Sequence, residues 1–162
     1  MKRLWVLGIL CLLLCGCGAE QTFETVGDTL EEPAAAIRRE VHVDLPGEAV
    51  APAMESDTSR YYICGDYEIS METFPSGDIK NTIKTISGFE PNDLTVVETN
   101  EDGVSRYDFV WAAEGEKGER LGRASVLDDG HYHYTLSVLR DAEKTEKTQV
   151  VWRTVFESFR LS

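Results

Sequence analysis

The sequence contains few basic residues for its number of acidic ones. Lysine and arginine together number 16, against 29 aspartate and glutamate residues, so the 162-residue chain has a formal net charge of −13 at pH 7. Nucleic acids are bound chiefly through lysine and arginine, and an acidic surface repels their phosphate backbone. We therefore expect no nucleic-acid partner.

The sequence also lacks the short motifs that mark common catalytic and phosphate-binding sites. It contains no Gly-x-Ser-x-Gly turn, no His-Glu-x-x-His zinc motif, no phosphate-binding loop and no Gly-x-Gly-x-x-Gly motif. We therefore predict a noncatalytic protein that carries no cofactor.

Cysteine is almost absent after the first 17 residues. Cys11, Cys15 and Cys17 lie close together, and Cys64 is the only other cysteine. A metal or redox site at the first three would need further ligands, yet they lie in a leucine-rich segment without a neighbouring histidine. Cys64 alone cannot form an intramolecular disulfide, so we predict a small buried apolar residue, with a reactive thiol as the alternative.

The apolar run at the amino terminus is too short for a membrane-spanning helix. At 1.5 Å per residue, residues 4–14 would cover about 16 Å of a hydrocarbon core roughly 30 Å thick. Lys2 and Arg3 precede this run. A positive start followed by a short apolar segment is typical of an export signal peptide.

The next residues resemble the lipobox of bacterial lipoproteins. In Leu14-Cys15-Gly16-Cys17, a leucine stands three places before the last cysteine and a small residue directly before it. The resemblance implies removal of residues 1–16, a diacylglyceryl group on the Cys17 thiol and an acyl chain such as palmitate on its new amino group. Two or more acyl chains anchor a protein stably. We expect the outer face of the cell membrane, although the inner face of an outer membrane remains open.

The mature chain divides into a tether and one domain. Residues 17–36 are polar and acidic without a sustained apolar period, which predicts a flexible tether with an r.m.s. span of about 25 Å. The length of residues 37–162 is typical of a single domain, which we expect to be monomeric.

Strand-type alternation recurs along the domain, with turn residues between the runs. Gly65-Asp66 and Asp128-Asp129-Gly130 predict hairpin turns. The aromatic residues of 104–113, which share one face, are predicted to form the centre of the core. The predicted strands are residues 37–45, 61–64, 67–73, 94–99, 104–113, 121–127 and 131–139, and residues 47–59 and 114–120 are predicted loops.

Helical periodicity marks two segments, about residues 76–87 and 142–159. Ser76 or Asp78 can cap the first helix, and Gly88 can end it. The elements together predict an α+β fold, a twisted antiparallel sheet of about six to seven strands with two main helices. Their order resembles the PsbP-like fold of small exported proteins, a resemblance that implies an architecture and no active site.

His131 and His133 are the candidate metal ligands of the sequence. Residues two apart on a strand point to the same side, and a His-x-His pair can supply two ligands to zinc or copper. A third ligand would be His42, a carboxylate or Cys64. Because the alternate residues of this strand are apolar, the two histidines are also predicted to lie on its polar face, where they need no function.

Acidic turns and aromatic residues supply two further candidate sites. Residues 128–129 and 100–102 could contact calcium, although neither turn has the spacing of a calcium-binding loop. Tyr61, Tyr62 and Trp111 could form a stacking platform if they met at one edge of the sheet, and burial in the core is the alternative.

The sequence therefore predicts a lipid-anchored, noncatalytic envelope protein whose domain binds a small ligand or a partner protein outside the membrane. Two alternatives remain open: a metal-binding or enzymatic accessory that uses His131 and His133, and a structural spacer. An apolar cleft on the sheet with exposed aromatic residues would favour ligand binding over the spacer.

Overall fold

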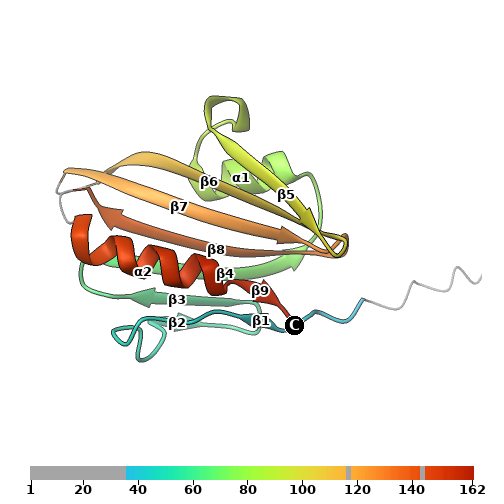
Figure 1. The fold of residues 1–162 in the computed structure, drawn as a ribbon, viewed down its shortest axis with the longest axis horizontal. Helices are drawn as coiled ribbons and strands as arrows, with labels where there is room; N and C mark the ends of the chain where they lie inside the picture. The colour runs from blue at the N-terminus through green and yellow to red at the C-terminus, as the bar shows by residue number, and fades with distance from the viewer. Residues whose placement is uncertain (1–35, 116–117, 143–144) are drawn as a thin grey trace, which may run out of the picture. The chain divides into compact units, whose positions relative to one another are not determined.

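A seven-stranded antiparallel sheet forms the centre of the computed structural model, which describes residues 36–115, 118–142 and 145–162 (Figure 1). The predicted signal peptide (1–16), the lipidated Cys17 and the tether up to residue 35 lie outside the described residues. The strand order is β2-β3-β4-β8-β7-β6-β5. The strands are β2 (Met54–Glu55), β3 (Ser59–Ile63), β4 (Tyr67–Pro75), β5 (Val96–Glu101), β6 (Val104–Gly115), β7 (Gly118–Asp128) and β8 (Tyr132–Asp141).

A connection that contains helices joins β4 to β5, and the sheet with its helices confirms the predicted α+β class. The predicted turns at Gly65 and Gly130 are present, and both glycines have positive φ values, of 66° and 85°. Most of the predicted loop at 114–120 is instead strand, because β6 continues to Gly115 and β7 starts at Gly118. Asp102 and Gly103 alone form the β5–β6 turn, with φ values of 51° and 79°, a two-residue turn that fits the twist of a hairpin.

Helix α1 (Ile79–Ser87) begins and ends at the predicted signals. The Asp78 side chain accepts a hydrogen bond from Lys80 N, and Gly88 ends the helix in the left-handed conformation. Helix α2 (Thr145–Ser158) is shorter at both ends than the predicted 142–159. Neither helix in the described ranges is long and apolar enough to cross a membrane. A short 3₁₀ helix, η1 (Pro91–Asp93), follows α1.

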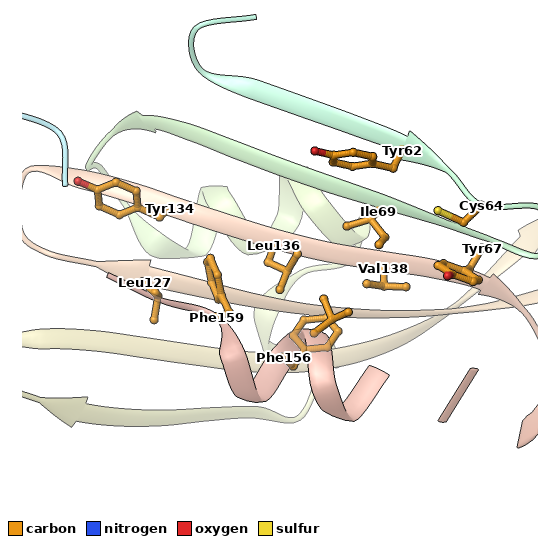
Figure 2. Close-up of a cluster of buried hydrophobic side chains, with 11 residues drawn as sticks. Tyr62, Cys64, Tyr67, Ile69, Leu127, Tyr134, Leu136, Val138, Phe156 and Phe159 are labelled. Atoms are coloured by element: carbon orange, nitrogen blue, oxygen red, sulfur yellow. The ribbon is translucent and has the colours of Figure 1, made fainter. Parts of the chain in front are cut away.

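Both faces of the sheet are covered, each by one helix (Figure 1). Neighbouring residues of a strand point to opposite faces, and Val126 and Leu127 accordingly belong to different core clusters. On one face, Phe156 of α2 and Phe159, directly after the helix, belong to the larger cluster (Figure 2). On the other face, Ile83 of α1 packs against the smaller cluster.

The aromatic residues of β6 do not form the centre of the core, contrary to the prediction. Phe109 and Trp111 belong to the smaller cluster, and Tyr107 packs at its border. The Trp111 indole lies directly over its cross-strand partner Gly122, where a Cβ atom would come within 2.1 Å of the ring. The larger cluster is centred on β4, β8 and α2 because these elements carry most of its buried residues.

The predicted strand at residues 37–45 is almost entirely irregular. Only β1 (Val41–His42) pairs, with the carboxy-terminal β9 (Arg160–Leu161). Ile37, predicted on the buried face, is 93 % exposed. Two tyrosines of β8 hold the start of this segment: Tyr132 Oη donates to Ala36 O (2.8 Å), and Arg39 N donates to Tyr134 Oη (2.8 Å).

Candidate functional site

A cavity of about 340 Å³ opens where the larger core cluster reaches the surface, beyond the carboxyl end of α2. Its apolar lining is part of that cluster, with Val104 and Leu127 from the sheet and Phe159 and Leu161 from the carboxy terminus. Ligand sites are typically mostly apolar clefts with a few polar groups. The polar lining residues are Arg39, Thr99, Glu101, Asp102, Arg106 and Arg160.

Strand register brings the sheet residues of this cavity together. Thr99 pairs with Arg106 across β5 and β6, and Arg106 pairs with Leu127 across β6 and β7. Directly paired residues share a face, so these three side chains lie on the face that α2 covers. The helix ends before this part of the sheet, because Ser158 is its last residue.

Arg106 holds the end of α2 to the sheet and forms one wall of the cavity. Its guanidinium donates to the carbonyls of Phe156 (3.0 Å) and Phe159 (3.1 Å), and also to Ser125 Oγ (3.0 Å). Nε donates to Asp108 Oδ2 at 2.7 Å, with a second contact of 3.2 Å from Nη2 to Oδ1. The last four carbonyls of a helix lack partners within it, so Arg106 serves as a carboxy-terminal cap.

Asp108 completes this network as the counter-ion of Arg106. Burial alone would raise the pKa of its carboxyl, but hydrogen bonds from Arg106 and Ser125 and the positive charges of Arg106 and Arg123 together lower that pKa below its ordinary value. The carboxylate is therefore charged at neutral pH and neutralises Arg106.

Arg39 and Arg160 are exposed, and their guanidinium groups make few hydrogen bonds. In the part of the chain that the structure describes, each guanidinium makes one hydrogen bond, to a main-chain oxygen. Arg39 Nε donates to Ser162 O (3.5 Å), and Arg160 Nη1 donates to Ser158 O (3.1 Å). Most of their donors remain available to a ligand.

Two carboxylates, those of Glu101 and Asp102 at the β5–β6 turn, also line the cavity. Both residues are exposed. Among the described residues, no ion pair joins either acid to Arg39 or Arg160. The cavity is therefore lined by two guanidinium groups from the segments at the two chain ends and by two carboxylates from the β5–β6 turn.

His133 is not on an exposed polar face, contrary to the prediction. Its side chain is fully buried, because α1 covers the face of β8 that the sequence pattern marks as polar. Ser76 Oγ donates to Asp128 Oδ1 (2.9 Å) and so accepts from His133 Nε2 (3.2 Å). Thr82 Oγ1 lies 2.9 Å from Nδ1. The ring thus links α1 and the segment before it to β8.

Ser76, His133 and Asp128 contain the residue types of a serine-hydrolase triad in a different arrangement. In such a triad the acid and the serine contact opposite ring nitrogens. Here Asp128 Oδ2 lies 3.5 Å from Nε2, the nitrogen that also contacts Ser76. Since the Ser76 hydroxyl donates to the carboxylate, the histidine does not accept its proton, and the geometry is structural.

The structure separates the two histidines of the predicted metal pair. His131 is exposed in the β7–β8 turn, whereas His133 is buried beneath α1. Within the described ranges, no group of three or more His, Cys, Asp or Glu side chains could hold a metal ion. That a metal binds His131 and His133 stays a hypothesis.

The acidic β7–β8 turn uses its carboxylates to fold the turn itself. Asp129 Oδ1 accepts from the main-chain nitrogens of His131 (2.9 Å) and Tyr132 (2.7 Å), and Oδ2 accepts from Tyr134 Oη (3.0 Å). Asp128 Oδ1 accepts from Gly130 N at 2.8 Å. These bonds account for the turn without the calcium ion considered from the sequence.

Cys64 is a buried free thiol, as predicted from the sequence. Burial raises the pKa of the thiol, and the negative charge of Glu48 raises it further. A hydrogen bond with Tyr67 lowers the pKa by less than burial raises it. Tyr67 Oη donates to Glu48 Oε2 at 2.6 Å. Less of the thiol is therefore ionised at neutral pH than in an exposed cysteine, which lowers its reactivity.

The proposed aromatic platform does not form. Tyr62 belongs to the larger core cluster and Trp111 to the smaller one, on opposite faces of the sheet. Tyr61 lies on β3, four strands from β6 in the sheet order. Burial and a hydrogen bond with Glu68 raise the pKa of Tyr61 to about 12, so its hydroxyl stays protonated.

Two further cavities, of about 260 Å³ and 460 Å³, each contain an arginine in their lining. In the smaller one, Arg60 pairs with Glu55 at 2.9 Å. In the larger one, Arg120 lies between Glu68 (3.1 Å) and Asp141 (3.5 Å). Their arginines are already paired, so neither cavity offers the free donors seen beside Arg39 and Arg160.

The sequence gives little signal for the cavity beside Arg39. Its residues come from β5, β6, β7 and both ends of the domain, and no motif links them. One signal could have pointed to it. Arg39 and Arg160 are basic residues in an acidic chain, and they lie close to the two ends of the predicted domain.

No protein-family model and no curated protein matches the sequence. The fold is similar to a crystal structure of LpqN, described as involved in cell envelope biogenesis of Mycobacterium tuberculosis. The two share 10 % identity with a TM-score of 0.49, over 77 % of this chain and 84 % of that one. At this level of similarity, the cavity has to be interpreted from this chain's own residues.

Proposed function

We propose that the chain is a lipid-anchored, noncatalytic envelope protein whose domain binds a ligand in the cavity between the β5–β6 turn and β9. The cavity itself supports the binding role. Apolar side chains of the core line it, together with two arginines whose guanidinium groups each make one hydrogen bond within the described residues. A spacer would have no use for an apolar opening of this kind, since exposed apolar surface is costly.

The anchoring role rests on the lipobox-like sequence Leu14-Cys15-Gly16-Cys17. Expression of the full chain and of a Cys17→Ser variant in a bacterial host tests it. We expect the wild-type protein to partition into detergent, and its amino-terminal peptide to begin at Cys17 with a diacylglyceryl mass. An unmodified Cys17, or equal partitioning of both proteins, would refute the anchor.

The binding role is tested by filling the cavity. Thr99 is exposed on its wall, and a Thr99→Trp substitution would occupy the space without disturbing a buried group. Lys80→Trp, on the exposed side of α1, is the matched control. Both variants and wild type are purified under native conditions and their bound small molecules extracted. We expect a compound in wild type and control that is missing from Thr99→Trp; identical extracts would contradict the proposal.

The metal-handling alternative has its own test. Residues 17–162 with Cys17→Ser are purified with His131 and His133 intact or both changed to Ala, and zinc and copper are measured by elemental analysis. Our proposal expects equal metal content in both. A histidine-dependent metal would instead favour the alternative.

A further inference from the structure

We infer that the cavity takes a small anion with an alkyl body, such as an alkyl carboxylate or an alkyl phosphate. This inference rests on the proposed binding function and adds the ligand's chemical class. It follows from two features of the lining, four apolar side chains continuous with the core and two guanidinium groups from the paired β1 and β9 segments.

The apolar side chains indicate the alkyl part of the ligand. Val104, Leu127, Phe159 and Leu161 are continuous with the larger core cluster, so an alkyl group there would extend the core outward. The volume of about 340 Å³ lies near the lower end of the range for ligand pockets. It therefore favours a single short chain over a whole diacyl lipid.

The arginines indicate the charge of the ligand. Arg39 and Arg160 line the cavity from segments that β1–β9 pairing holds close together. A guanidinium presents its donors as a planar fork that matches carboxylate and phosphate oxygens. Because Asp108 already neutralises Arg106, Arg39 and Arg160 are the groups that would bind the anion.

The carboxylates of the turn set the orientation of the ligand. Glu101 and Asp102 would repel an anion, so its charged end must lie toward β9 and its alkyl end toward β6. This arrangement predicts effects of opposite sign. Removing positive charge at Arg39 and Arg160 weakens binding, whereas Glu101→Gln strengthens it.

Calorimetric titration of residues 17–162 with Cys17→Ser tests the inference, since both core clusters lie within residues 36–162. The probes are butanoate, hexanoate, octanoate, hexyl phosphate, inorganic phosphate, hexanol and hexylammonium. We expect affinity to rise up to about fourfold per added methylene until the cavity is full. Anions should bind at least about tenfold more tightly than hexanol or hexylammonium.

The variants separate the cavity from the rest of the surface. Arg39→Gln/Arg160→Gln should weaken hexanoate binding at least about tenfold, while Arg153→Gln, an exposed arginine on α2, should leave it unchanged. Glu101→Gln should tighten binding about two- to threefold. Thermal unfolding confirms that each variant is folded.

Each outcome decides a separate point. Hexanol binding as tightly as hexanoate, without dependence on Arg39 and Arg160, would refute the anionic class and leave the proposed function standing. Inorganic phosphate binding as tightly as hexyl phosphate would refute the alkyl part. No binding of any probe would contradict both the inference and the proposed function.

Sedimentation with phosphatidylglycerol vesicles distinguishes the two sources of such a ligand. Sedimentation that hexanoate displaces, and that Arg39→Gln/Arg160→Gln abolishes, would assign the anion to a membrane lipid. Hexanoate binding without sedimentation would assign it to a free amphiphile.

Discussion

Replacing Arg106 with Met tests whether this residue fastens α2 to the sheet. The methionine keeps an apolar stem of similar length but loses the bonds to Phe156 O, Phe159 O, Ser125 and Asp108. Hydrogen bonds to a charged group contribute about 1.5–3 kcal/mol each in net terms, and they are not additive. The side chains of Arg106 and Asp108 are 25 % and 26 % exposed, so water replaces part of the loss. We expect destabilisation of about 2–4 kcal/mol.

Urea and thermal unfolding of Arg106→Met measure this loss. For a domain of this size, the expected fall in Tm is about 6–15 °C. Adding Asp108→Asn should recover about 1 kcal/mol, because it removes a partly buried carboxylate that has lost its ion pair with Arg106. Arg153→Met is the control, with a change within about 0.5 kcal/mol. A loss below about 1 kcal/mol in Arg106→Met would refute the fastening role.

The pH dependence of the same variant gives an independent check. Since the pKa of Asp108 is lowered in the fold, its contribution to stability is present above its unfolded pKa and is lost as pH falls through the folded value. We therefore expect the stability gap between wild type and Arg106→Met to be full at pH 7 and to shrink below about pH 4. A gap that stays constant down to pH 2 would contradict the role of Asp108.

Three further substitutions or measurements test the packing. Gly122→Ala should cost about 1–3 kcal/mol in unfolding experiments, because its Cβ would meet the Trp111 ring, and Trp111→Leu in the same chain should recover part of that cost. His133→Ala should speed amide hydrogen exchange in α1 more than in α2, since it removes the links to that helix; equal acceleration would argue against the local role. Cys64 should react with a disulfide reagent at pH 8 more than about tenfold slower than in the urea-unfolded chain, and equal rates would show that it is accessible.

Local signals in the sequence predicted much of the fold. The helix end at Gly88 and the turns at Gly65 and Gly130 depend on neighbouring residues only and are present, and of the two predicted caps, Ser76 and Asp78, the structure uses Asp78. The α+β class follows from the same alternation and periodicity.

Features that depend on distant residues were not predictable in this way. His133 shows the pattern of an exposed residue, because an alternation in polarity does not reveal that a helix with Thr82 covers the polar face. Residues 37–45 alternate in the manner of a strand, yet only Val41 and His42 find a partner, at the opposite end of the chain. The larger core cluster likewise lies on β4, β8 and α2 and not on β6, because its position depends on which elements pack together in the fold.

The candidate site was the least predictable part, because it arises where α2 stops and not from a motif. Arg39 and Arg160 are more than a hundred residues apart in the sequence, and pairing of β1 with β9 brings both into the lining of one cavity. The predicted metal pair of His131 and His133 depended on strand spacing alone. In the structure α1 covers His133, whereas His131 is exposed in a turn.

Methyl NMR of residues 17–162 with Cys17→Ser, titrated with hexanoate, tests most directly whether the open end of the core is the binding site. Our account predicts that the methyl signals of Val104, Leu127 and Leu161 shift together and saturate at one ligand per chain, while those of Ile83 on the other face stay in place. Shifts centred on Ile83, or on Val41 and Met71 beside the 260 Å³ cavity, would contradict it.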